Sequence, residues 1–96
     1  MRYLQVHWNH GFSGDPVILY SEIDADGYEI RKVDEYANGR LDLADYGIET
    51  GNTSLGTAPT PTLEEINRDA QFRATPLDPE EFERIWDRAK ACFELS

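Results

Sequence analysis

The chain is 96 residues long, the size of a single domain, and its 40% of hydrophobic residues suffice for one compact core. Nine Lys and Arg residues against nineteen Asp and Glu residues give a formal net charge of -10. This charge argues against direct contact with a nucleic-acid backbone or an anionic membrane surface. The single cysteine excludes an internal disulfide, and with it a disulfide-stapled secreted scaffold.

The first half of the chain is predicted to form short strands separated by turns. At its start, Leu4, Val6 and Trp8 lie on one side of an alternating pattern, which is typical of a half-buried strand. The following stretch, 9–15, holds two Gly residues and several turn formers, and is therefore expected to be a loop. The expected strands cover residues 2–8, 17–23, 28–36 and 41–46.

Two dipeptides, Asp26-Gly27 and Asn38-Gly39, are expected to form the turns between the later strands. Both suit a two-residue type I′ turn, because Asp, Asn and Gly adopt positive φ at little cost. The register that follows places these pairs opposite each other: Ile23 and Ile30, Glu22 and Arg31, Tyr36 and Leu41, and Lys32 and Asp45.

In this register one sheet face is largely apolar, and we expect it to form the core. Its residues are Val17, Leu19, Ile23, Tyr28, Ile30, Tyr36, Leu41 and Leu43. The second face is expected to be exposed, and it carries Ile18, Tyr20, Glu22, Glu29, Arg31, Val33, Glu35, Asp42, Ala44 and Tyr46.

This second face has the composition of a protein interface, because tyrosines supply contact area and carboxylates steer a basic partner. The alternative is an ordinary solvated sheet face whose charges pair across strands. The partner contacts predicted from this face are Tyr20, Glu22, Glu29, Glu35, Asp42 and Tyr46.

A long connection and a short helix are expected to follow the strands. Residues 47–61 are rich in Gly, Thr and Pro and show no hydrophobic period. Thr62 and Glu65 then have the spacing of a capping box, in which the two side chains satisfy free backbone groups at a helix start. The sequence therefore predicts a helix over about residues 62–70.

A second, longer helix is predicted over about residues 78–94. Asp78 is expected to cap it and Pro79 to occupy its first turn. The helix carries one apolar stripe, which we expect to lie on the apolar sheet face, formed by Phe82, Ile85, Trp86, Ala89 and Phe93.

Together these features predict one α+β domain over residues 1–96, a four-stranded antiparallel meander with two C-terminal helices packed on one face. The first or the last strand leaves a free sheet edge, so both a monomer and an edge-strand dimer are open. The N-terminus lacks the apolar region of a signal peptide, and no apolar run approaches the roughly 18 residues of a spanning helix. We therefore expect a cytoplasmic protein.

The two histidines, His7 and His10, are the only candidates for a metal site. No cysteine or acidic cluster stands beside them at ligand spacing, so backbone hydrogen bonds are the favoured expectation. No residue set has the spacing of a catalytic constellation, and we expect neither a metal nor a cofactor.

The chain resembles a family of small, uncharacterised bacterial proteins described only as a domain of unknown function. The resemblance covers nearly the whole chain and supports the one-domain interpretation, but it implies no activity and no catalytic residues. It is carried by Met1-Arg2-Tyr3-Leu4-x-Val6-x-Trp8, Asp15-Pro16-Val17-x-Leu19-Tyr20-Ser21-Glu22, Asp26-Gly27-Tyr28-Glu29-x-Arg31-Lys32-Val33, Asn38-Gly39-Arg40, Glu49-Thr50-Gly51, Leu55-Gly56-x-x-Pro59-x-Pro61-x-Leu63-Glu64-Glu65-Ile66-Asn67 and Phe82-x-x-x-Trp86.

In size and charge the chain is similar to immunity proteins, which block a toxin by covering its basic active site. The sequence therefore favours a non-enzymatic domain that binds a basic protein, as an immunity-type inhibitor of a toxin such as a nuclease. One alternative is a small-ligand or hydrolytic module that uses the His7–His10 loop and the 50–57 loop. Another is a nucleic-acid mimic with the same negative surface.

Overall fold

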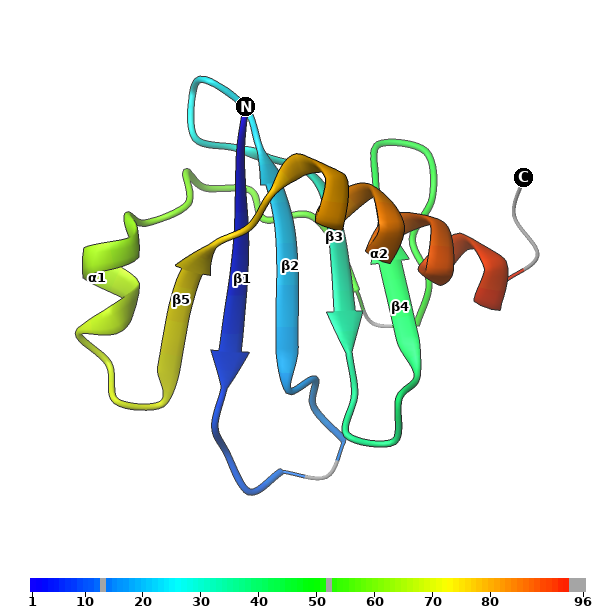
Figure 1. Ribbon diagram of the computed structural model, residues 1–96, viewed down its shortest axis with the longest axis horizontal. Coiled ribbons are helices and arrows are strands. Elements are labelled where there is room, and N and C mark those ends of the chain that lie inside the picture. The colour runs from blue at the N-terminus through cyan, green and yellow to red at the C-terminus, as the bar shows by residue number, and fades with distance from the viewer. Residues whose placement is uncertain (13, 52, 94–96) are drawn as a thin grey trace.

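A computed structural model describes residues 1–12, 14–51 and 53–93. The strands form one antiparallel sheet in the order β4-β3-β2-β1-β5 (Figure 1). The elements are β1 (Arg2–Trp8), β2 (Ile18–Ile23), β3 (Glu29–Glu35), β4 (Leu41–Ala44), α1 (Leu63–Asn67), β5 (Phe72–Pro76) and α2 (Pro79–Cys92). The α+β class is confirmed, whereas the predicted count of four strands is wrong, because the sheet has five.

The additional strand is β5, which lies between the two helices in the chain and pairs with β1. Ala74 stands opposite Val6, and Pro76 stands opposite Leu4. In β5 only the small side chain of Ala74 is buried. Phe72 and Ala74 alternate with polar Arg73 and Thr75, but the alternation is short and ends at a proline, so the strand depends on pairing with residues far away in the sequence.

Both hairpin turns contain three residues instead of the two that were predicted. In the first hairpin the Asp24 N–H donates to the Tyr28 carbonyl at 2.9 Å, and in the second the Tyr36 N–H donates to the Arg40 carbonyl at 2.9 Å. The third loop residue is Gly27 (φ 91°) in the first turn and Gly39 (φ 89°) in the second. Three-residue loops of this kind require positive φ at their last position, which glycine adopts without strain.

The extra loop residue has different consequences in the two hairpins. Between β2 and β3 a bulge beside Ile23 restores the predicted register, so Glu22 faces Arg31 as expected, although Ile23 faces Glu29. Between β3 and β4 nothing restores the register, and β4 is shifted by one residue. A one-residue shift turns every side chain to the opposite face, and Leu43 therefore joins Val33.

The shift decides which sheet face forms the core. The α2 face, marked by Tyr20, Val33 and Leu43, is covered by α2, which buries Phe82 and Trp86 against it. The sequence had assigned Tyr20 and Val33 to the exposed face, so that assignment is wrong. With Leu41 and Leu43 moved to their side of the sheet, these residues became the apolar surface on which the α2 stripe packs.

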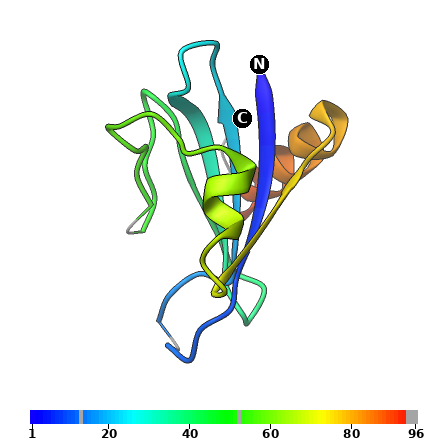
Figure 2. The same ribbon diagram turned by 90° about the vertical axis from the view of Figure 1, so that its left-hand side faces the viewer.

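The two helices do not share a face. Figure 2 shows α2 on one side of the sheet, and α1 with the long connection on the other. The α1 face carries Leu4, Val6 and Leu19, and Ile66 of α1 lies near them. Thr62 is the N-cap of α1 and accepts a hydrogen bond from the Glu65 N–H at 3.2 Å, as the capping box predicts.

The boundaries of α2 agree with the prediction at its start. Asp78 is the N-cap and Pro79 is the first residue, but the Asp78 side chain forms no capping hydrogen bond. The helix ends at Cys92. Residue 94, to which the prediction extended, lies outside the described residues.

Candidate functional site

The six predicted partner contacts are distributed over both sheet faces and one turn. Tyr20 lies in the core with 6% of its surface exposed, and its hydroxyl donates to Glu35 at 2.9 Å. Desolvation by burial, together with this hydrogen bond, raises the pKa of Tyr20. Tyr20 and Glu35 therefore hold each other on the α2 face, and Tyr20 is not accessible to a partner.

Glu29 and Asp42 lie on the opposite, α1 face. The Glu29 carboxylate accepts hydrogen bonds from the Ser21 hydroxyl at 2.8 Å and the Gly56 N–H at 2.7 Å. Asp42 is buried, with 3% of its surface exposed, and accepts from the Thr50 hydroxyl at 2.9 Å. Both acids thus fasten the long connection to the sheet, and the expectation of one exposed face carrying all six residues is wrong.

Glu22 is buried at the upper end of the α2 face and belongs to an ion-paired group. Arg31 Nε donates to its carboxylate at 2.6 Å, and the Tyr3 hydroxyl donates to it at 2.8 Å. The hydrogen bond from Arg31 lowers the pKa of Glu22, although burial opposes this effect. Arg31 also pairs with Glu83 of α2 and lies 4.9 Å from the ring centre of Phe82, so two carboxylates share one guanidinium.

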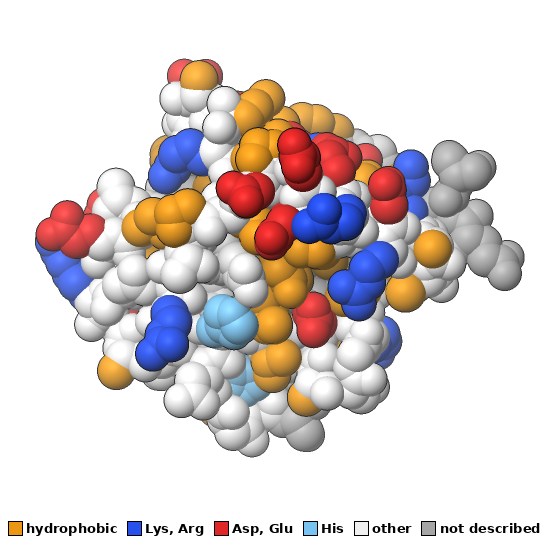
Figure 3. Space-filling model, in the orientation of Figure 1, with side chains coloured by type: hydrophobic (Ala, Val, Ile, Leu, Met, Phe, Trp, Pro, Cys, Tyr) orange, Lys and Arg blue, Asp and Glu red, His pale blue; other side chains and the backbone are white. Residues whose placement is uncertain are grey.

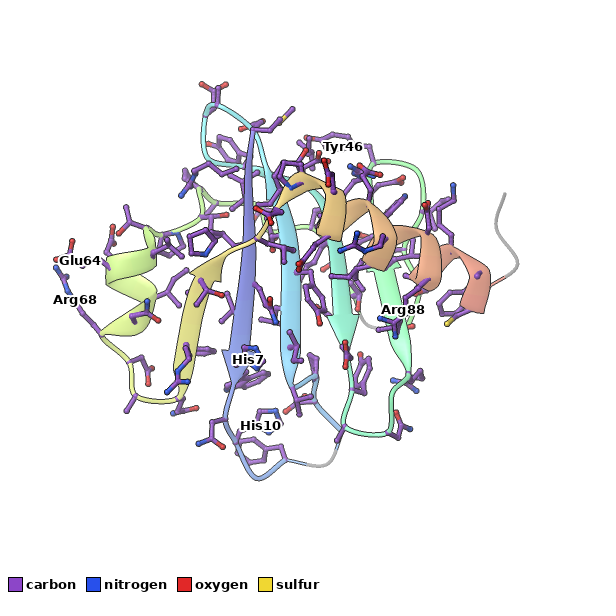
Figure 4. All side chains as sticks on the ribbon, viewed as in Figure 1. His7, His10, Tyr46, Glu64, Arg68 and Arg88 are labelled. Carbon is purple, nitrogen blue, oxygen red and sulfur yellow. The ribbon has the colours of Figure 1, made fainter. Side chains whose placement is uncertain are left out.

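Beside this ion-paired group lies a surface depression of about 480 Å³, which we call the Tyr46 depression. It lies between the start of β3 and the turn that follows β4, which carries Tyr46 (Figure 4). Tyr46 is 79% exposed and Ile48 is 36% exposed. The lining residues are Glu22, Ile30, Arg31, Asp45, Tyr46, Gly47 and Ile48.

The turn that presents Tyr46 is held by Asp45. One oxygen of its carboxylate accepts the backbone N–H groups of Gly47, at 2.7 Å, and Ile48, at 2.9 Å. The Asp45 N–H also donates to the Ile48 carbonyl at 2.8 Å. An Asx-type turn therefore fixes the backbone and leaves the two large side chains facing outward.

The electrostatic character of this region is negative. Glu22, Glu83 and Asp45 carry three negative charges here, and they are opposed by Arg31 and by the N-terminal ammonium, which also lowers the pKa of Glu22. On the face seen in Figure 3, acidic side chains over the N-terminal part of α2 lie beside Lys and Arg side chains, and exposed Glu81 of its first turn lies 3.9 Å from Arg84. An exposed aromatic anchor beside surplus carboxylates suits a basic protein surface.

Sequence reasoning identified Tyr46 and Glu22 but missed Ile30, Asp45 and Ile48 of the depression. The available signal was the run Asp45-Tyr46-Gly47-Ile48, which places two large apolar side chains in turn-forming residues. Such a run is typical of side chains presented on the surface, whereas the prediction extended a strand through residue 46.

The two histidines lie at the lower end of the sheet (Figure 4). His10 is hydrogen-bonded through Nε2 to the Pro16 carbonyl at 2.8 Å, and its Nδ1 accepts from the Phe12 N–H at 2.9 Å. The backbone bonding expected of His10 is thus confirmed. His7 instead lies 3.0 Å from the Gln5 side-chain amide.

Among the described residues, none of the 50–57 loop lines the cavity beside His7. The cavity beside His7, of about 710 Å³, is lined by residues 67 and 70–75 and by Asn9. Asn52, within the 50–57 loop, lies outside the described residues. In the part of the chain that the structure describes, no three His, Cys, Asp or Glu side chains are grouped as a metal site requires. No helix within those residues has the length and hydropathy to cross a membrane.

Comparison with known proteins places the chain in one family. A family model described as a domain of unknown function, DUF6881, matches residues 2–91. No curated protein and no solved structure shows significant similarity to the chain. Since the match spans almost all of the 96 residues, the chain belongs to the DUF6881 family.

Proposed function

We propose that the chain is a non-enzymatic domain that binds a basic protein through the Tyr46 depression. The observation that carries this proposal is the exposed pair Tyr46 and Ile48 beside carboxylates that outnumber the single guanidinium of Arg31. An aromatic side chain on a fixed turn contributes contact area at a low entropy cost, and surplus negative charge raises the association rate with a cationic partner.

The partner class that fits this surface is a basic bacterial toxin, such as a nuclease, and the domain acts as its immunity-type inhibitor. The net charge of -10 supports this, because a negative body can cover a cationic active site without chemistry of its own. A nuclease active site is cationic because it binds phosphates. The contacts we propose differ from those predicted from the sequence. Of the predicted set only Tyr46 remains an exposed contact, because Glu22 is 6% exposed and contributes its charge from within the lining of the depression.

A rescue assay tests this function. The chain is co-expressed with a basic toxin domain encoded beside its own gene, in a host that the toxin kills. We expect survival with the wild-type chain, reduced survival with Tyr46→Ala, and full survival with Phe12→Ala. Phe12 is a matched control because it is also exposed, at 66%, and lies outside the Tyr46 depression.

Two outcomes would reject the proposal. If no neighbouring basic toxin is neutralised, the immunity role is wrong. If rescue is equally strong with Tyr46→Ala and wild type but is lost with Phe12→Ala, the assigned surface is wrong. A nucleic-acid mimic would instead compete with DNA for DNA-binding proteins that are not toxins, so a panel of such proteins distinguishes the two functions.

A further inference from the structure

A cavity of about 340 Å³ lies on the α1 face, the side of the sheet away from α2. Leu4, Val6 and Leu19, from the adjacent strands β1 and β2, form its apolar floor. Ile66 of α1 and Pro61 of the connection lie above the floor. The cavity is therefore built from the sheet, the helix and the connection together.

The cavity exists because the layer over the α1 face is incomplete. The helix α1 has five residues, so it is only about 7.5 Å long and cannot cover the central strands. Leu19 consequently remains partly exposed, although β2 has a neighbouring strand on both sides. The volume equals about eleven water molecules and lies at the lower end of the range of small-molecule sites.

The rim of the cavity is negatively charged. Glu29, Glu65 and Asp69 all line it, and each carboxylate accepts hydrogen bonds from neutral donors, which leave its charge uncompensated. The one cation among the lining residues is Lys32, whose ammonium lies 4.0 Å from the buried carboxylate of Asp34. The cavity thus combines an apolar floor with a surplus of negative charge at its mouth.

We propose that this cavity binds a small amphipathic organic cation. The whole cation has about nine to twelve non-hydrogen atoms; its apolar body lies against Leu4, Val6 and Leu19, and its ammonium group meets the rim carboxylates. An anion of the same shape is repelled by Glu29, Glu65 and Asp69, and a neutral molecule gains only the apolar contact. The site is independent of the Tyr46 depression, and it does not depend on the function proposed there.

Three probes that share a phenylethyl body and differ in their head group test the charge preference: 2-phenylethylamine, 2-phenylethanol and 3-phenylpropanoate. Each is titrated into the full chain at low salt, and the methyl resonances of Leu4, Val6 and Leu19 are followed by NMR. We expect the amine to shift these resonances with a Kd at least tenfold below that of the alcohol, and the carboxylate to bind more weakly than the alcohol. Equal affinity for all three probes, or shifts confined to other residues, would overturn the proposal.

Matched variants separate the charge contribution from folding. Glu65→Gln combined with Asp69→Asn keeps the hydrogen-bond acceptors but removes two rim charges, whereas Glu64→Gln changes an exposed neighbour that does not line the cavity. We expect the double variant to lose the amine-over-alcohol preference and Glu64→Gln to keep it. Leu19→Phe fills the floor and should abolish binding of both probes. An unchanged preference in a correctly folded double variant would contradict the site.

Discussion

The side-chain amide of Asn67 forms with Ala74 the two hydrogen bonds that a neighbouring strand would form. The Ala74 N–H donates to Asn67 Oδ1 at 2.6 Å, and Asn67 Nδ2 donates to the Ala74 carbonyl at 3.0 Å. Nearby, the Phe72 N–H donates to the Asp69 carbonyl at 3.0 Å, and Pro76 has no N–H group. The N–H groups on the outer edge of β5 are therefore occupied or missing, which opposes pairing with another chain.

Replacing Asn67 should open this edge. We expect Asn67→Ala to lower the free energy of unfolding by about 1–3 kcal/mol, because two buried backbone groups lose their partners. We also expect the variant to associate at high concentration, since the free edge can pair with a second copy. Urea unfolding and analytical ultracentrifugation measure the two effects.

Arg68→Ala is the matched control, because Arg68 is the exposed neighbour of Asn67 at the end of α1. It should unfold like the wild type and remain monomeric. Two results together would show that the Asn67 amide does not protect the edge. The wild-type chain would already dimerise, and Asn67→Ala would change neither the stability nor the association.

The ion pair of Glu22 predicts a contribution to acid stability. Because Arg31 lowers the pKa of Glu22 in the folded chain, the stabilisation is fully present above the unfolded pKa of about 4.3 and is lost as the pH falls through the folded value. Glu22→Gln should lower the free energy of unfolding at pH 7 by about 2–3 kcal/mol and flatten its decline below pH about 4. Unfolding curves from pH 2 to 7 test this, and an unaltered acid limb would refute it.

We expect Asp34 to make the stability of the fold depend on pH in the opposite direction. Burial raises the pKa of this carboxyl, while Lys32 and the hydrogen bond from Thr53, at 2.7 Å, oppose the shift. Stability is therefore lost as the pH rises from the unfolded pKa through the folded value. Asp34→Asn keeps an acceptor for Thr53 and should become more stable relative to wild type as the pH rises through this window. A variant–wild-type difference independent of pH would contradict the argument.

Substitutions of Gly51 and Gly39 separate two energetic costs of adding a side chain: the strain of a positive φ and the collision of the new Cβ with its neighbours. Both have positive φ, at 57° and 89°, but a Cβ at Gly51 would collide with the Asp42 carboxylate, whereas a Cβ at Gly39 would meet open space. We expect Gly39→Ala to cost about 1 kcal/mol from backbone strain, and Gly51→Ala to cost more, because the connection must move away from Asp42. Thermal unfolding of both variants measures the difference, and equal losses would show that the collision is relieved freely.

Local sequence signals were sufficient for much of this fold. The alternation around Val6, the capping box at Thr62 and the stripe through Phe82 and Trp86 each reflect short-range periodicity, and each predicted element is present. The pairing of Glu22 with Arg31 was also correct, because a bulge compensated for the longer turn. These features depend on neighbours within a few residues.

The errors came from two features that short sequence patterns do not determine, the length of a turn and the pairing of strands that are far apart in the chain. A dipeptide such as Asn38-Gly39 is compatible with loops of two or three residues, and that single residue decides which face Leu41 and Leu43 occupy. The strand β5 depends on β1, more than sixty residues away in the chain, and carries no strong pattern. The prediction of an exposed second face was also wrong, because Tyr20, which had been placed on that face, belongs to the core.

The most direct test of the central claim is a calorimetric titration of the catalytically inactive toxin partner with the wild-type chain, Tyr46→Ala and Phe12→Ala, at low and high salt. We predict that Tyr46→Ala weakens binding at least tenfold, that Phe12→Ala leaves it unchanged, and that salt weakens wild-type binding. Binding by Tyr46→Ala with wild-type affinity, or binding that salt does not affect, would contradict an acidic interface at the Tyr46 depression.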